Sequence, residues 1–339
     1  MWIALRTLAI GAMGALLAFG AGIPAPFLTG PAFFVTAAAL TGLKAVVHPR
    51  YRDAIFVVIG VNMGTSVTPE AVATVARWPG SLAILTLSVL VIFLGGARLL
   101  RSVSGMDRMS ALLTATPGHL SFVLSLSTDV KADIGRVTMI QTMRVLSLTL
   151  IVPFLAPLLS ETPLTAFRLP GQMMSMIPLA GLLLMAVAVG LVFQKMRLPA
   201  ALLLGGMAVS AIAHAFALTE GMVPQWLSIP AFVSMGTLIG TRFTGVTPRM
   251  VLSSLGASAM LTGFAAAISL LGALVVSRLL GLPILNVLIA FAPGGLETMM
   301  AMSILLDANP AYVAAHHVFR LVFLSVLLPF LVARIRPRA

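Results

Sequence analysis

The sequence predicts an all-α polytopic membrane protein made of two inverted repeats, each with five transmembrane helices and one re-entrant broken-helix hairpin. Three observations lead to this fold class: an apolar composition, an internal repeat and the placement of the basic residues. Of the 339 residues, 60% are hydrophobic and only 9% are charged, whereas soluble domains carry about 25% charged residues. Mean hydropathy is +1.10, so we expect most of the chain to lie in a lipid bilayer.

Several apolar runs have the length of a membrane span. The clearest are residues 9–24, 80–97, 174–193 and 255–277. About 20 residues of helix cover the roughly 30 Å hydrocarbon core of a bilayer. The net charge of +12 comes from Lys and Arg in short clusters between apolar runs, where membrane proteins carry them. The charge therefore does not indicate a nucleic-acid partner, and the absence of Cys excludes disulfides and thiolate ligands.

The two halves of the chain repeat each other. At a constant offset of 176 residues, Pro117-Gly118 aligns with Pro293-Gly294, Ser127 with Ser303, Arg144 with Arg320 and Pro153 with Pro329. Pro24-Ala25 aligns with Pro199-Ala200 at an offset of 175. A fixed register of this kind indicates duplication of one structural unit. We therefore predict two membrane repeats, residues 1–165 and 170–339.

Each repeat is predicted to contain five spans and one broken element. The spans are residues 4–24, 26–43, 53–68, 79–98 and 134–158 in the first repeat, and 174–194, 199–216, 227–241, 251–277 and 311–333 in the second. The first run resembles a signal peptide, but its repeat partner at 174–194 indicates a retained span. The third span of each repeat carries G-x-x-x-G, at Gly60 and Gly64 and at Gly236 and Gly240, which we interpret as close helix packing.

The broken elements are residues 108–128 and 283–306, each cut near its middle by Pro-Gly. Each arm of about 9 to 13 residues is too short to cross alone, so the element either crosses as a kinked helix or returns as a hairpin. Hairpins invert the second repeat and leave 16 Lys and Arg inside and 3 outside, whereas crossing elements leave 12 and 7. The positive-inside rule favours hairpins, ten crossings and two cytoplasmic termini.

Three ionisable residues lie deep in the predicted membrane elements: Arg144, Arg320 and Glu297. A charge at the bilayer centre costs about 2.5–3.5 kcal/mol, so it should face a partner or a cavity. Each Arg either forms an ion pair, caps carbonyls of the hairpin, or binds an anionic ligand. Arg320 has Glu297 as a nearby acid, but the repeat counterpart of Glu297 is Ser121. We interpret the unbalanced Arg144 as a sign of an anionic ligand.

The two hairpin tips also favour a negatively charged ligand. The second arm of each hairpin starts with free backbone N–H groups and the positive end of its helix dipole. We predict substrate contacts from Arg144, Arg320 and the tip residues, which are Pro117, Gly118, His119, Pro293, Gly294 and Gly295. The alternative is that Pro-Gly only makes a turn in a packed hairpin.

Glu297, His316 and His317 are the candidates for coupling to an ion. Glu297 occupies the first turn of its arm, where it could act as a cap, as a partner of Arg320 or as a proton carrier. His316 and His317 lie within one helical turn of Arg320, and His titrates near neutral pH. Their alternative role is hydrogen-bonded packing. The sequence shows no metal-ligand set, P-loop or Ser-His-Asp triad, so we expect neither a cofactor nor an enzyme.

Three motifs in the second repeat carry a resemblance to a known family. They are A-P-G-G-L-E-T-M at 292–299, A-A-H-H-V-F-R-L at 314–321 and L-L-P-F at 327–330. Together they resemble the membrane AbrB family, whose members are labelled ammonia monooxygenase or regulator of aidB expression. The resemblance covers essentially the whole chain and implies a duplicated, multi-pass protein of the bacterial inner membrane. His119 and Ser121 depart from the second-repeat pattern.

The sequence leads to two main functional hypotheses. The first is a secondary transporter of a small anionic metabolite, working by alternating access around a midplane site. The second is a membrane sensor that affects gene expression indirectly, as the family label implies. A membrane oxygenase is a third hypothesis, without a visible metal or flavin site. The expected partners are the lipid bilayer and a small anionic ligand, with no direct nucleic-acid partner; homo-oligomer formation is left open.

Overall fold

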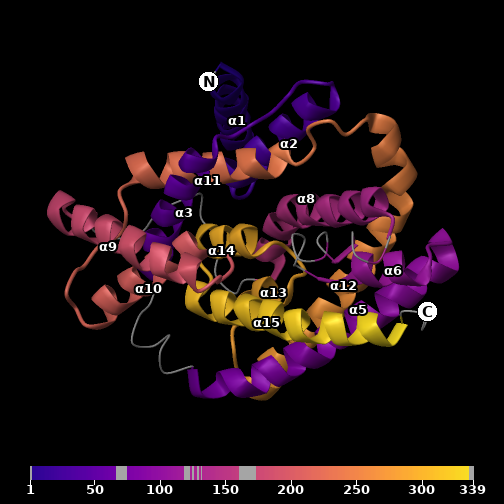
Figure 1. The fold of residues 1–339 in the computed structure, drawn as a ribbon. Helices are drawn as coiled ribbons and strands as arrows, with labels where there is room; N and C mark the ends of the chain where they lie inside the picture. Colours follow the sequence, from indigo (N-terminus) through magenta and orange to yellow (C-terminus); the bar gives the residue numbers. More distant parts are fainter. Residues whose placement is uncertain are drawn as a thin grey trace. The chain divides into compact units, whose positions relative to one another are not determined.

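In the part of the chain that the structure, a computed structural model, describes, helices are joined by short connections and there is no β-strand. The structure describes residues 2–65, 75–117, 123, 126–127, 130, 132–159 and 173–335. The helices are α1 (Trp2–Gly20), α2 (Pro26–Leu40), α3 (Pro49–Gly64), the short 3₁₀ turn η1 (Val75–Arg77), α5 (Trp78–Ser104), α6 (Arg108–Ala115), α8 (Ile134–Leu159), α9 (Met176–Lys195), α10 (Ala201–Ala215), α11 (Gln225–Thr241), α12 (Pro248–Leu280), α13 (Ile284–Phe291), α14 (Leu296–Leu305) and α15 (Pro310–Ile335) (Figure 1). The all-α class is confirmed.

Six of these helices are long and apolar enough to cross a membrane: α1, α5, α8, α9, α12 and α15. The protein is therefore a membrane-spanning helical protein. The helices α2 and α10 have 15 residues each, α3 has 16 and α11 has 17. At 1.5 Å per residue they reach about 22–26 Å, short of a 30 Å core. Ten crossings, two re-entrant hairpins and inversion of the repeats stay predictions.

Helix boundaries recur along the chain at the offset seen in the sequence. Arg108 and Ile284 begin α6 and α13, and Ile134 and Pro310 begin α8 and α15, in both cases 176 residues apart. The reason is local, because the residues that end helices recur at the same offset. Gly105 and Gly281 both have positive φ, 60° and 64°, directly after α5 and α12, a conformation that glycine adopts without steric cost and that ends helices.

The chain forms two compact units, and each takes helices from both halves of the sequence. Unit 1 consists of Met1–Ala76, Thr149–Val246 and Leu296–Ala314. Unit 2 consists of Arg77–Leu148, Thr247–Gly295 and Ala315–Ala339. The compact units are thus distinct from the predicted repeats 1–165 and 170–339, which stay a prediction.

In unit 1, helices from the first half of the sequence pack against helices from the second half. α3 packs against α10, and α11 packs against α2. A Cβ added to Gly60 would collide with the backbone carbonyl of Leu203, and one added to Gly236 would collide with that of Leu28. Only glycine allows such close backbone approach. The interpretation of both G-x-x-x-G motifs as helix-packing motifs is confirmed.

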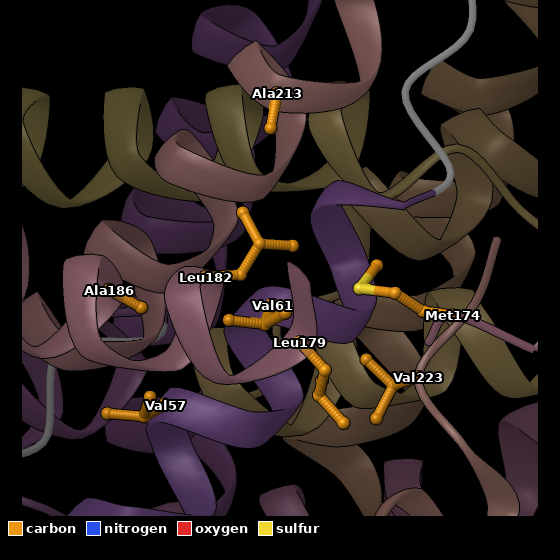
Figure 2. Packing of buried hydrophobic residues seen from close by; sticks show 8 residues of the cluster. All are labelled: Val57, Val61, Met174, Leu179, Leu182, Ala186, Ala213 and Val223. Carbon is orange, nitrogen blue, oxygen red and sulfur yellow. The ribbon is translucent and has the colours of Figure 1, made fainter. Parts of the chain in front are cut away.

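A buried apolar cluster closes the α3–α9–α10 part of unit 1, as Figure 2 shows. Its residues are Val57, Val61, Met174, Leu179, Leu182, Ala186, Ala213 and Val223. Beside it, the backbone N–H of Met174 donates to the carbonyl of Met222 at 2.9 Å. This contact ties the segment before α9 to the segment before α11, so unit 1 has an ordered apolar core.

In unit 2 each long helix, α5 or α12, carries a short helix beside it. α6 packs against α5, α13 packs against α12, and α5 packs against α12. The short helices α6 and α13 are the first arms of the two broken elements. Of the eight residues of α6, six are buried, and the same holds for α13. Their ends therefore lie inside the protein, where backbone groups need partners.

Candidate functional site

The site in unit 2 begins with two helices that end inside the protein. α6 ends at Ala115 and α13 at Phe291, and the next residues, Thr116 and Ala292, both precede proline. Proline excludes helical geometry at the residue before it. Thr116 (φ −61°, ψ 121°) and Ala292 (φ −54°, ψ 131°) are extended accordingly. The following proline has no N–H, so the carbonyls at these ends need donors from elsewhere.

Arg320 supplies those donors at the end of α13. Its Nη1 donates to the carbonyl of Ala292 at 2.8 Å, and its Nη2 donates to the carbonyl of Gly294 at 3.1 Å. Nη2 also lies 2.7 Å from Nδ1 of His317. The side chain is 1% exposed, and only its Nε lacks a hydrogen-bond partner among the described residues. Arg320 therefore acts as a clamp on the tip of the second broken element.

Arg144 has the corresponding place at the end of α6, but it makes fewer contacts. Its Nη2 donates to the carbonyl of Thr116 at 3.1 Å. Nε and Nη1 have no hydrogen-bond partner in the part of the chain that the structure describes, although the side chain is only 1% exposed. Buried polar groups almost always have a partner. Arg144 has two nitrogens without a partner among the described residues and Arg320 has one, so Arg144 is the stronger candidate for a ligand contact.

A second pair of hydrogen bonds fixes each arginine helix to its broken element. Nε2 of Gln141 donates to the carbonyl of Leu113 at 2.9 Å, and Nε2 of His317 lies 3.1 Å from the carbonyl of Ile289. Gln141 and His317 are 176 residues apart, so they are repeat counterparts. An amide in one half makes the contact that an imidazole makes in the other.

The partners of His317 determine where its proton lies. The carbonyl of Ile289 can only accept, so Nε2 carries the hydrogen. The guanidinium of Arg320 can only donate, so Nδ1 is bare and accepts from Nη2. His317 is therefore neutral and held at both nitrogens. A second proton on Nδ1 would face the Arg320 cation and break that hydrogen bond.

His316 faces a different environment on the same helix. It is fully buried, and its Nε2 lies 2.9 Å from the hydroxyl of Ser81. Its ring stands at 6.3 Å from the ring of Trp78 and at 6.1 Å from the ring of Phe291, measured between centroids. His316 thus packs among aromatic rings and contacts a hydroxyl group, and its role in coupling stays a prediction.

The two fully buried arginines of unit 2, Arg144 and Arg320, have no carboxylate partner among the described residues. Arg144 and Arg320 lie close enough to repel each other electrostatically. Among the described acids of unit 2, Asp107 accepts from backbone N–H groups at the start of α6, and Asp133 accepts from that of Arg136 in α8. Two buried cations without a counter-ion are unfavourable in a low-dielectric interior. The site therefore attracts negative charge.

Comparison with known proteins shows the family of this chain. The family model described as "Transition state regulatory protein AbrB" matches residues 2–336. The chain belongs to the AbrB family. It is 30% identical over 298 residues to "Uncharacterized protein YhjN" of Bacillus subtilis (strain 168), covering 80% of this chain and 75% of that protein. It is 24% identical over 320 residues to "Putative regulator AbrB" of Escherichia coli (strain K12), covering 90% and 88%.

The structure of this AbrB-family chain brings together part of the predicted substrate site. Arg144, Arg320, Pro117, Pro293 and Gly294 are buried and Gly295 is half-buried, all of them in unit 2. Gly118 and His119 lie outside the described residues. Glu297 is half-buried and belongs to unit 1, so its predicted pairing with Arg320 stays a prediction. The expectations of no cofactor and no enzymatic activity also stay predictions.

Sequence reasoning did not single out three polar residues that the structure makes conspicuous. Gln141 could have been found, because it aligns with His317 at the repeat offset. Asn62 and Thr298 lie in apolar segments and are fully buried, with polar atoms that lack partners among the described residues. No spacing rule marks them, since a single Asn or Thr in an apolar helix is common.

Proposed function

We propose that this AbrB-family protein is a secondary transporter of a small organic or inorganic anion. The observation that carries the proposal is the pair of buried guanidiniums in unit 2, which retain open N–H groups and have no carboxylate partner among the described residues. A guanidinium binds carboxylate or phosphate-like oxygens through several charge-assisted hydrogen bonds. An anion bound there would offset both positive charges.

The two broken elements support transport over simple binding. Backbone that leaves helical geometry at membrane depth occurs where it is buried in protein or lines a cavity. Transporters place substrates at the ends of such discontinuous helices, between inverted repeats. In our proposal the repeats invert, each broken element returns to its own side of the inner membrane, and both termini are cytoplasmic. Access to the arginines then alternates between the two sides.

The proposal assigns different roles to the residues of the site. Arg144 contacts the anion through its open Nε and Nη1 groups. Arg320 contributes charge and holds the Ala292–Gly294 tip in place, so it tolerates substitution poorly. His317 positions Arg320 by accepting its hydrogen bond, because its proton is already fixed on Nε2. Glu297 is the remaining candidate for coupling to an ion.

Uptake by the purified protein in proteoliposomes tests this function directly. Radiolabelled mono- and dicarboxylates, phosphate and sulfate would be supplied outside, with and without an imposed cation gradient. We expect saturable uptake of at least one of these anions by the wild type. Arg144→Gln should abolish it, because the variant removes the open charged donors but keeps an N–H₂ for the Thr116 carbonyl. Uptake by Arg144→Gln at the wild-type rate would refute the assignment.

The names of the family and of its Escherichia coli relative favour a second candidate, a membrane-bound regulator. The same arginine site would then sense an anion, and the effect on gene expression would be indirect. Both candidates predict anion binding, but only the transporter predicts flux. Anion-dependent thermal stabilisation of the protein together with zero flux in sealed, correctly reconstituted vesicles would favour the regulator.

A further inference from the structure

Unit 1 holds a second set of buried polar groups without partners among the described residues. Asn62 on α3 is 1% exposed, and neither Oδ1 nor Nδ2 has a hydrogen-bond partner there. Thr298 on α14 is fully buried, and its Oγ1 lacks a partner in the same part of the chain. Leaving a buried amide and a buried hydroxyl unpaired is unfavourable, so this combination calls for a ligand.

The packing of α3 determines which way Asn62 faces. Gly60 and Gly64 contact α10. Asn62 is two residues from each glycine, about 200° around the helix axis at 3.6 residues per turn. It therefore lies on the face of α3 away from α10. Among the described helices, α9, α11 and α14 also pack against α3. Since α14 carries Thr298 in its first turn and packs against both α3 and α11, the two open groups belong to contacting helices.

The residues that correspond to Asn62 and Thr298 in the other half are apolar, so packing alone does not require polarity at these two positions. At the repeat offset, Asn62 corresponds to Leu238, Thr298 to Phe122 and Glu297 to Ser121. An amide, a hydroxyl and a carboxylate thus each occur in only one copy of the repeat. Glu297 immediately precedes Thr298 and is half-buried in the same unit. The three differences concentrate on two contacting helices, which is expected if they serve one asymmetric site.

We propose that Asn62, Thr298 and Glu297 bind a small monovalent cation, for which Na⁺ is the probe. The amide carbonyl, the hydroxyl and the carboxylate are the oxygen ligands that hard cations take in proteins. One carboxylate balances one positive charge. A role in coupling rests on the proposed function: moving an anion against an inside-negative potential is unfavourable, and moving one cation with it cancels the charge. Binding itself does not depend on transport.

The experiment measures the melting temperature of the detergent-purified protein in NaCl and in choline chloride at equal ionic strength. Because a ligand that binds only the native state stabilises it in proportion to its concentration and affinity, we expect a saturable rise in melting temperature with Na⁺. Asn62→Leu, which installs the residue of the second repeat, should lose this rise and still fold, since it also removes an unpaired buried amide. Thr298→Val, which removes only the hydroxyl, should weaken it.

Two controls separate this proposal from the proposed function. Ser258→Ala removes an equally buried hydroxyl from α12 of unit 2, which also lacks a partner among the described residues, and should keep the Na⁺-dependent rise. Arg144→Gln should lose stabilisation by anions but keep the rise with Na⁺. The proposal is overturned if Na⁺ stabilises the wild type no more than choline does, or if Asn62→Leu keeps the full Na⁺-dependent rise.

Discussion

The first and second broken elements of unit 2 share a scaffold but differ in how their arginines are satisfied. In both, a helix of eight residues stops before a proline, and an arginine 28 residues later donates to the carbonyl left there. Arg320 donates to two carbonyls and to His317, whereas Arg144 has one acceptor and two open nitrogens among the described residues. The two halves thus use one frame, but only the second satisfies most of the guanidinium N–H groups, so the proposed anion contact falls to the first.

The largest effect on stability should come from removing Arg320, whose hydrogen bonds are nearly all made. Arg320→Ala leaves the carbonyls of Ala292 and Gly294 buried without donors, at about 1–3 kcal/mol each. We expect a loss of several degrees in melting temperature, and a reduced yield of monodisperse protein on size-exclusion chromatography. Arg144→Ala removes the donor of one carbonyl and should destabilise the protein less. If the Arg320 variant melted like the wild type, its role as a clamp would be wrong.

The next effect concerns Arg144, and it should appear in anion binding more than in the stability of the protein. Charge-assisted hydrogen bonds contribute about 1.5–3 kcal/mol each, so Arg144→Gln, which removes those from both Nε and Nη1, should weaken anion binding by about 100-fold or more. The melting temperature without added anion should stay near the wild-type value. Thermal-shift titrations with the transported anion measure both quantities. Equal anion affinity in the variant and the wild type would mean that the open donors of Arg144 do not meet the ligand.

A smaller effect on stability is expected when His317 is replaced by the residue type at the corresponding position of the first half, Gln141. His317→Gln keeps an N–H donor for the Ile289 carbonyl, as Gln141 does for Leu113, and offers an amide oxygen to Arg320. We expect destabilisation below about 1.5 kcal/mol and an unchanged pH profile of transport, because His317 is held neutral at both nitrogens. The reciprocal variant Gln141→His controls for ring size. A pH optimum that moves only in His317→Gln would restore His317 as a proton carrier.

Much of this fold could be predicted because its signals are local. Apolar runs mark the long helices, and Pro and Gly mark their ends; α8, for example, runs over Ile134–Leu159 where the sequence predicted 134–158. The repeat offset singles out Arg144 and Arg320 by sequence alone. The membership of each compact unit was not predictable, since it depends on which glycine faces meet. The acceptors of Arg320 were also left open, because backbone carbonyls have no sequence signature.

The smallest effect concerns the cap that starts the first broken element. The carboxylate of Asp107 accepts from the backbone N–H groups of Met109 at 3.0 Å and of Ser110 at 2.9 Å. Partial burial raises the pKa of Asp107, but hydrogen bonds from the Ser110 side chain and from these backbone groups outweigh it, so the pKa lies below its usual value. The ionised carboxylate is thus the form that stabilises the start of α6.

The sign of the pH dependence follows from that lowered pKa. The contribution of Asp107 is fully present above the pKa of the unfolded chain, about 3.9, and is lost as pH falls through the lower folded value. Asp107→Ala should destabilise the protein by about 1 kcal/mol at neutral pH, and its melting temperature should approach that of the wild type in acid. Asp107→Asn keeps a capping oxygen without the titrating group, so it should lose less stability at neutral pH, and its smaller gap to the wild type should also close in acid. A gap between Asp107→Ala and the wild type that widens in acid would show that the carboxylate is not the stabilising form.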